Sequence, residues 1–232
     1  MLTVPCTVYG EYIMNKKYDA VIFDFDGTVV DTGLGIIESL KYSLEKNGVA
    51  IPDMEKLRRF IGPPIYDSYI NDYGATDDNV ADFISSYRER YFVKGIYECE
   101  LYEGIEHLLR TLKNAGYKTG IASSKPEKLV YDVMAYTKIT DYFDYVSAAS
   151  LDESKHITKA ELIKNCANAL GLSDMKRVLM VGDRCFDLDG ASIAGTDSAG
   201  MAYGYGGREE LIQHNATYIF DSADELEAFL IK

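Results

Sequence analysis

Short apolar runs alternate with amphipathic stretches along most of this chain. Residues 19–24 (Asp-Ala-Val-Ile-Phe-Asp) form an apolar run that acids and Gly27 close, which is typical of a buried strand. The next comparable run is residues 117–122, and residues 177–181 are the most apolar of the set. Further strands are predicted at residues 145–149, 198–202 and 218–220.

Apolar residues between these strands recur at helical spacing. Gly116 and Gly171 stand where the C-terminal ends of helices are expected. The predicted helices cover residues 104–115, 126–136, 158–170, 188–194, 207–214 and 223–230. Apolar strands that alternate with helices indicate a parallel sheet covered on both faces.

The alternation breaks between about residues 33 and 100. Apolar residues from Ile36 to Leu44 fall at helical spacing, and Asn47-Gly48 ends that helix. Residues 61–64 (Ile-Gly-Pro-Pro) form a stiff turn that is poor in hydrogen-bond donors. Around this turn, helices are predicted at residues 56–60, 66–73 and 79–92.

These patterns predict an α/β fold in three parts. Residues 18–32 and 101–232 form a core with a Rossmann-like parallel sheet, and residues 33–100 form an inserted, all-helical cap. Residues 1–17 form an N-terminal extension that lacks the basic start and apolar stretch of a signal peptide. We expect residues 1–13 to carry little function, although an ordered strand or an arm onto a neighbouring protein stays an alternative.

Composition and charge narrow the class of protein. The 232 residues are 47% hydrophobic, which is enough to bury a core. The net charge of −13, with no basic face, argues against binding to a nucleic acid polymer or a membrane surface. The four cysteines form no Cys-x-x-Cys pair, which fits reduced thiols in a cytoplasm. We expect a cytoplasmic protein that is a monomer or a weak dimer.

Polar side chains gather where the predicted strands end. Residues 24–28 (Asp-Phe-Asp-Gly-Thr) follow the first strand, residues 123–125 (Ser-Ser-Lys) the second, and residues 182–187 the strand at 177–181. Lys159 opens the helix that leads to that last strand. Ligands of open parallel sheets bind outside the carboxyl ends of the strands, so we expect these groups to meet at one edge.

The expected cluster suits phosphoryl transfer. Carboxylates held together repel each other unless a cation lies between them, and Mg²⁺ accepts carboxylates while completing its shell on phosphate. Asp24 could then attack phosphorus and form an aspartyl-phosphate. Asp26 could protonate the leaving oxygen and later deprotonate the hydrolytic water. Gly27 would let the following amides face phosphate, and Ser123 and Lys159 would stabilise its charge.

Each residue alone has a plainer explanation. Ser123 could be a helix N-cap, Lys159 a solvated lysine, and Asp187 the cap of the following helix. An Asp-x-Asp-Gly sequence is often only a turn, although the stretch from Asp24 lacks the spaced acids of a calcium loop. The order of these groups on successive strands favours a common site.

Four segments resemble the motifs of the haloacid dehalogenase superfamily of hydrolases. Residues 23–32 (FDFDGTVVDT) resemble the first motif, residues 121–126 (IASSKP) the second, and residues 181–187 the fourth. Lys159, with the residues after it, is the better match to the third motif. Lys155 is a competing candidate, because the proline-rich form of that motif is absent. The resemblance runs from about residue 18 to the C-terminus.

The resemblance implies Asp24 as nucleophile and Asp26 as general acid and base. It also implies Mg²⁺ held by Asp24, the Asp26 carbonyl and Asp183, with Asp187 as a ligand or in the outer shell. Ser123 and Lys159 would bind the phosphoryl group.

The inserted helices are similar to the small cap of phosphoglycolate-phosphatase-like members of the superfamily. Residues 59–64 resemble the cap loop that reaches into the site, and residues 203–206 and 208–211 are also similar to that branch. The substrate contacts expected on this basis, besides Ser123 and Lys159, are Gly27, Thr28, Ser124, Gly62 and Arg59.

The chain is therefore predicted to be a Mg²⁺-dependent phosphatase of small phosphorylated metabolites, with phosphoglycolate and nucleoside monophosphates as the leading substrates. A sugar-phosphate mutase of the same superfamily stays an alternative. So does a phospho-receiver-like signalling protein, although such proteins usually place their acids on different strands and have no inserted lid. Substrate choice would depend on cap side chains whose orientation the sequence does not give.

Overall fold

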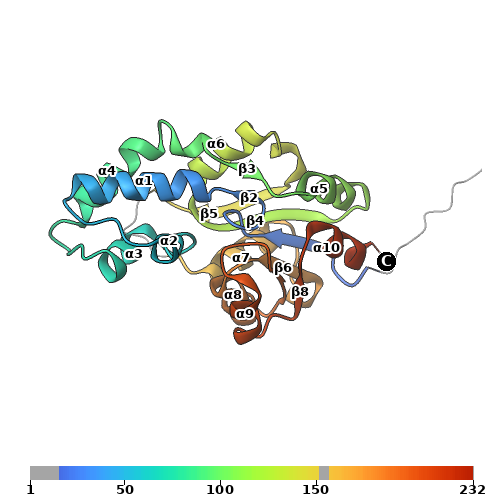
Figure 1. The fold of residues 1–232 in the computed structure, drawn as a ribbon. Helices are drawn as coiled ribbons and strands as arrows, with labels where there is room; N and C mark the ends of the chain where they lie inside the picture. The colour runs from blue at the N-terminus through green and yellow to red at the C-terminus, as the bar shows by residue number, and fades with distance from the viewer. Residues whose placement is uncertain (1–15, 152–156, 232) are drawn as a thin grey trace, which may run out of the picture.

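The computed structural model describes residues 16–151 and 157–231, which are built around a six-stranded sheet (Figure 1). The strand order is β5-β4-β1-β6-β7-β8, and every neighbouring pair is parallel. The strands are β1 (Ala20–Phe23), β4 (Lys118–Pro126), β5 (Tyr145–Ala149), β6 (Val178–Gly182), β7 (Asp197–Met201) and β8 (Tyr218–Phe220). The predicted α/β fold with a Rossmann-like parallel sheet is confirmed.

Helices cover both faces of the sheet, as Figure 1 shows. One face carries α5 (Ile105–Asn114), α6 (Glu127–Thr137) and α10 (Ala223–Leu230), and the other carries α7 (Lys159–Ala169) and α8 (Cys185–Ala194), with α9 (Gly207–Gln213) beside α8. In β1, Val21 and Phe23 pack toward the first face, and Ala20 and Ile22 toward the second. Because both faces are covered, β1 is apolar at every position, which explains its uninterrupted apolar sequence.

Two core elements differ from their predicted bounds by three residues or more. β4 was expected to end at residue 122, but it continues to Pro126 with a shift of register against β5 after Ser123. Helix α8 starts at Cys185, three residues earlier than expected, because the Asp187 carboxylate accepts a hydrogen bond from the Arg184 amide and closes the first turn. Short 3₁₀ turns, η2 (Thr140–Tyr142) and η3 (Met175–Arg177), precede β5 and β6.

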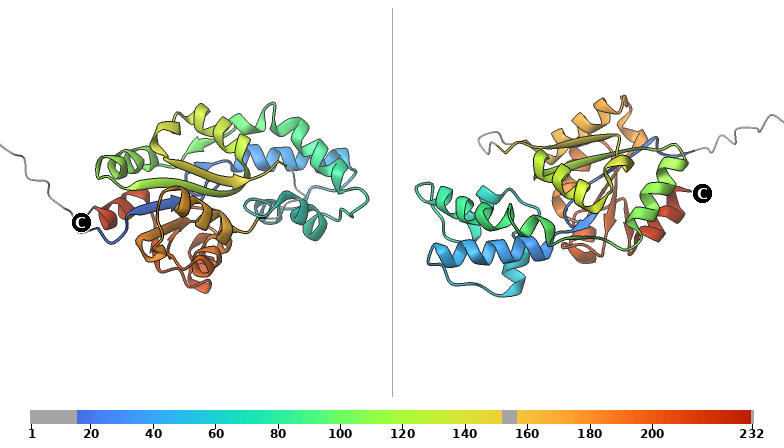
Figure 2. Two further views of the ribbon diagram at one scale, coloured as in Figure 1. Left: turned by 180° about the vertical axis from the view of Figure 1, so that it is seen from behind. Right: turned by 90° about the horizontal axis from the view of Figure 1, so that it is seen from above.

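A helical cap projects from one end of the core, as the view from above in Figure 2 shows. It contains α1 (Gly33–Lys46), α2 (Met54–Arg58), α3 (Ile65–Asp72), α4 (Val80–Tyr91) and the 3₁₀ turn η1 (Gly95–Tyr97). The short antiparallel strands β2 (Val30–Asp31) and β3 (Glu100–Leu101) connect it to the core, and the sequence pattern did not predict this ribbon.

The boundaries of the cap at residues 33 and 100 stay a prediction, as does the N-terminal extension at residues 1–17. Residues 1–15 lie outside the described part of the chain. None of the helices in the described ranges is long and apolar enough to cross a bilayer.

Aromatic rings form the centre of the cap. The Phe60 ring lies 5.2 Å from that of Tyr69, 5.7 Å from Tyr73 and 5.6 Å from Tyr87, measured between centroids. Tyr87 stacks in turn on Tyr91 at 5.2 Å. Rings in such pairs add specific geometry to apolar burial, so this cluster fixes α4 relative to the loop that follows α2.

Candidate active site

The loop after β1 carries the first two acids of the site. The Asp24 amide donates to the Val181 carbonyl at 2.8 Å, which continues the pairing of β1 with β6 and places Asp24 at the carboxyl edge of the sheet. The chain then turns back sharply, because the amides of Val29 and Val30 both donate to the Phe25 carbonyl. Gly27 adopts a φ of +91° in this turn, a conformation that favours glycine.

Three acids meet at this edge in a buried cluster. Asp24, Asp183 and Asp187 each offer one carboxylate oxygen, and these oxygens all lie within 4.8 Å of one another. Burial, reinforced by the Asp187 charge, raises the pKa of Asp24 to about 7. Burial and the neighbouring carboxylates also raise the pKa of Asp183 well above its usual range. Acids this close are costly to ionise without a cation, and oxygen ligands suit a hard divalent ion, so these residues fit Mg²⁺.

Lys159 supplies positive charge beside two of the three acids. Its Nζ lies 2.8 Å from Asp24 Oδ1 and 2.9 Å from Asp187 Oδ1, and it donates to the Ala122 carbonyl at 3.0 Å. Burial lowers the pKa of Lys159, but Asp187 and Asp24 outweigh burial and raise it above its ordinary value. The lysine is therefore charged, and Lys155, its rival in the sequence, lies outside the described residues.

Asp183 is held from two sides. The Thr28 hydroxyl donates to Asp183 Oδ1 at 2.9 Å, and the Tyr205 amide donates to Oδ2 at 2.7 Å. The loop around Gly204 packs closely here, since a Cβ on that residue would lie 2.2 Å from the Asp183 Cβ. These contacts fix the direction of the Asp183 carboxylate, and both donors are neutral groups.

Thr28 and Gly27 were expected to contact substrate, but their polar groups are directed elsewhere. The Thr28 hydroxyl is buried against Asp183, and the Gly27 amide donates to the Val30 carbonyl at 2.9 Å. The turn closes on itself because the chain runs back into β2, which begins at Val30. We therefore assign both residues a supporting role around Asp183.

Asp26 lies apart from the three-acid cluster. Its carboxylate accepts hydrogen bonds from the Thr32 hydroxyl at 2.7 Å and from Lys125 Nζ at 3.0 Å and 3.1 Å. The residue lines the same cavity as Asp24, so its side chain faces the space in which a substrate would react. This separation leaves Asp26 available for proton transfer.

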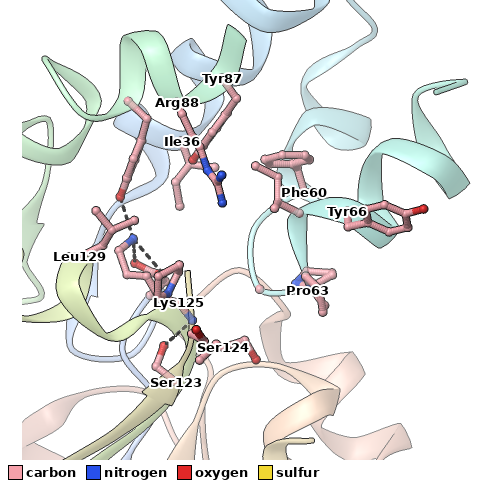
Figure 3. Close-up of a pocket in the computed structure, with 18 of the residues that line it drawn as sticks. Ile36, Phe60, Pro63, Tyr66, Tyr87, Arg88, Ser123, Ser124, Lys125 and Leu129 are labelled. Atoms are coloured by element: carbon pink, nitrogen blue, oxygen red, sulfur yellow. Dashed lines mark hydrogen bonds and ion pairs between the residues drawn. The ribbon is translucent and has the colours of Figure 1, made fainter. Parts of the chain in front are cut away.

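A cavity lies between core and cap (Figure 3), and Asp24 and Asp26 are among the residues that line it. The cap contributes Phe60, Gly62, Pro63, Pro64, Ile65, Tyr66, Tyr87, Arg88, Tyr91 and Phe92, and the end of β4 contributes Ser123, Ser124, Lys125 and Pro126. Figure 3 shows Arg88 extending from α4 into the open space. Arg88 also donates to the carbonyl of Leu151, two residues after the end of β5, at 3.4 Å.

Ser123, Ser124 and Gly62 line this cavity as the sequence analysis expected, but Arg59 does not. The Arg59 guanidinium is exposed and pairs with Glu55 at 2.7 Å, one helical turn earlier. Helix α2 turns Arg59 outward while the buried Phe60 faces the cluster of rings. The structure therefore places Arg59 at the surface, outside the residues that line the cavity.

Ser123 is not a helix N-cap. It lies inside β4, and Pro126 holds the position before α6. The Ser123 hydroxyl accepts a hydrogen bond from the Lys125 amide at 3.2 Å and keeps its own proton for another acceptor. This geometry leaves a donor at the floor of the cavity.

Two residues of the predicted strand ends were given no role on the basis of the sequence. Lys125 reaches Asp26, and Arg184 bridges core and cap by pairing with Glu210 at 3.0 Å and donating to the Ile61 carbonyl. Lys125 could have been found, because it follows Ser123 at a strand end. Arg184 gave no such signal, since its partners come from two distant segments.

This chain is similar to known hydrolases in both sequence and structure. A family model described as haloacid dehalogenase-like hydrolase matches residues 21–201. A 5'-nucleotidase of Pseudomonas aeruginosa is 34% identical over 202 residues, which cover 87% of this chain and 90% of that protein. The pyrophosphatase PpaX of Bacillus velezensis is 31% identical over 213 residues, which cover 91% of this chain and 96% of the relative.

A solved structure described as a predicted phosphatase from Clostridium acetobutylicum superposes with a TM-score of 0.86 at 36% identity. The match covers 92% of this chain and 98% of that one. The chain is thus similar along nearly its whole described length, cap included, to proteins named as phosphatases.

Proposed function

This chain belongs to the haloacid dehalogenase-like hydrolase family, and from that premise we propose that it is a Mg²⁺-dependent phosphatase whose nucleophile is Asp24. It is a phosphoric monoester hydrolase. The observation that carries the proposal is the meeting of three buried carboxylates with the Lys159 ammonium, next to a cavity that one of these carboxylates, Asp24, lines. A dianionic phosphate ester can be bound there only if added positive charge outweighs the acids.

Asp24, Asp183 and the Asp26 carbonyl would hold Mg²⁺, and Asp187 would ligate or orient its shell. When bound, the ion withdraws charge from the phosphoryl oxygens and keeps the carboxylates ionised. Lys159 neutralises part of the charge on Asp24 and on the transferring group. Ser123 donates its hydroxyl proton to a phosphoryl oxygen.

The reaction runs in two displacements. An oxygen of Asp24 attacks phosphorus, the bond to the leaving oxygen breaks, and Asp26 gives that oxygen a proton. Asp26 then takes a proton from water, the resulting hydroxide attacks phosphorus, and the Asp24 carboxylate is released with inorganic phosphate. The cap closes the cavity against bulk water during both steps.

Nucleoside monophosphates are the first substrates to test. Phe60, Tyr66 and Tyr87 give the upper cavity an aromatic surface on which a flat base can stack. The relative named 5'-nucleotidase supports the same choice. Phosphoglycolate is the second candidate, because the inserted helices resemble the small cap of phosphoglycolate-phosphatase-like members of the superfamily.

We place the reaction in the cytoplasm, on a small phosphorylated metabolite, in a monomer or weak dimer. A sugar-phosphate mutase would use the same acids, but no feature of the described cavity favours it. The receiver-like alternative is set aside, since the chain belongs to a family of hydrolases.

A screen of phosphorylated metabolites, with release of inorganic phosphate as readout, tests the proposal. We expect phosphate release from at least one nucleoside monophosphate or from phosphoglycolate, complete loss of that release with EDTA, and recovery on adding Mg²⁺. Isomerisation of a hexose phosphate without net phosphate release would favour a mutase. Full activity in EDTA would contradict the role of the metal.

A further inference from the structure

Lys125 connects the acid–base residue of the core to the cap. Its side chain is 5% exposed at the end of β4. The Nζ atom lies 3.0 Å and 3.1 Å from the two Asp26 carboxylate oxygens and 2.6 Å from the Tyr91 hydroxyl. Figure 3 shows Lys125 beside Ser123 and Ser124 at the floor of the cavity.

The donors of Lys125 are all in use. A lysine ammonium has three N–H donors, and the two Asp26 oxygens and the Tyr91 oxygen accept all three. Lys159, by contrast, lies against the nucleophile itself. The contacts of Lys125 therefore serve to orient Asp26 and leave no donor for a phosphoryl oxygen.

Tyr91 ties this arrangement to the position of the cap. It is the last residue of α4, is buried, and stacks on Tyr87, which in turn contacts Phe60. The Lys125 ammonium also lies 5.0 Å from the centre of the Tyr91 ring, within range of a cation–π contact. If α4 moved away from the core, Lys125 would lose both the hydroxyl and the ring.

We propose that Lys125 is a positioning residue that holds the Asp26 carboxyl in its working direction, and that Tyr91 makes this direction depend on a seated cap. The inference rests on the proposed function, because it requires Asp26 to exchange protons with the leaving group and with water. Thr32, which donates to Asp26 at 2.7 Å just before α1, completes the support from the side of the cap.

With p-nitrophenyl phosphate as the substrate, the rates of the two chemical steps distinguish a residue that positions Asp26 from one that acts on the phosphoryl group. In the first step, Asp24 takes the phosphoryl group and the P–O bond to nitrophenolate breaks. Nitrophenolate is a stable anion and needs no proton from Asp26. In the second step, water loses its proton to Asp26 as its oxygen bonds to phosphorus, and the bond from phosphorus to Asp24 breaks. A misdirected Asp26 should slow only the second step.

The experiment is a single turnover with enzyme in excess, in which nitrophenolate and free phosphate are followed in the same quenched samples. For Lys125→Met we expect nitrophenolate release within about threefold of wild type and phosphate release slower by about 100-fold, the scale of a displaced catalytic group. Tyr91→Phe should slow phosphate release in the same way by about tenfold. Lys128→Met, which alters an exposed lysine of α6 paired with Asp132, should change neither rate.

Combination with Asp26→Asn provides a further check. If Lys125 acts through Asp26, the double variant should be no slower in phosphate release than Asp26→Asn alone. Thermal unfolding establishes that each variant is folded, and Tyr91→Phe keeps the ring and its packing if Lys125→Met does not fold.

Three results would overturn the inference. Equal slowing of both steps would place Lys125 in phosphoryl transfer, a raised KM with an unchanged kcat would make it a substrate ligand, and unchanged rates would leave it without a role in turnover. A separate result would contradict the proposed function itself. If Asp24 were not the nucleophile, Asp24→Asn would still release nitrophenolate at the wild-type rate.

Discussion

Replacing Asp24 with asparagine should reduce phosphate release by about four orders of magnitude or more, the scale seen when a catalytic nucleophile is removed. The asparagine amide keeps the shape of the side chain and still presents an oxygen to Lys159, so the fold should survive. Steady-state release of phosphate from p-nitrophenyl phosphate, alongside a thermal melt, measures both expectations.

A surface acid supplies the control for this variant. Asp221 pairs with Arg208 on exposed side chains, away from the cavity, and Asp221→Asn should keep full activity. An Asp24→Asn protein that turns over at a near-native rate would show that another group attacks phosphorus.

Replacing Lys159 with methionine should damage both stability and turnover. Removal of the ammonium leaves Asp24 and Asp187 buried without their shared cation, which costs about 3–5 kcal/mol of unfolding free energy for a pair of this kind. Loss of a charge that stabilises the transferring phosphoryl group should lower kcat by about 10²–10³-fold. Denaturant unfolding and steady-state kinetics check the two effects separately.

The stability lost in Lys159→Met should also depend on Mg²⁺. Mg²⁺ at the acidic cluster would replace part of the missing positive charge, so Lys159→Met should lose less stability with saturating Mg²⁺ than in EDTA. Lys164→Met changes an exposed lysine on the same helix and should behave like wild type in every assay. If the loss of stability were the same with and without Mg²⁺, the lysine and the metal would not share a site.

Much of the core followed from the sequence because local pattern and burial agree there. β1 and β6 are apolar runs with clear ends, and parallel pairing brings the carboxyl ends of neighbouring strands together. Asp24 and Asp183 could be placed at one edge for that reason alone. Lys159 could be placed there as well, because it opens the helix that leads to β6, and in the structure a capping box of Thr158 and Glu161 begins that helix.

The remaining parts of the site depend on tertiary contacts that no local pattern contains. Arg59 and Phe60 are adjacent, yet one faces solvent and the other the cavity, and the packing of α2 decides which. The link from Lys125 to Tyr91 exists only because α4 packs over the end of β4. The sequence suggested Thr28 as a substrate ligand, because it does not show that the Thr28 hydroxyl donates to Asp183.

Identification of the phosphorylated residue tests the central claim most directly. Asp26→Asn enzyme mixed with a radiolabelled aryl phosphate and Mg²⁺, then quenched in acid, should carry a label that hydroxylamine removes and that maps to the peptide containing Asp24. The same mixture in EDTA should carry none. A label on Ser123 or on any other residue, or turnover by wild-type enzyme in which no label can be trapped at Asp24, would contradict a phosphoryl transfer through that carboxylate.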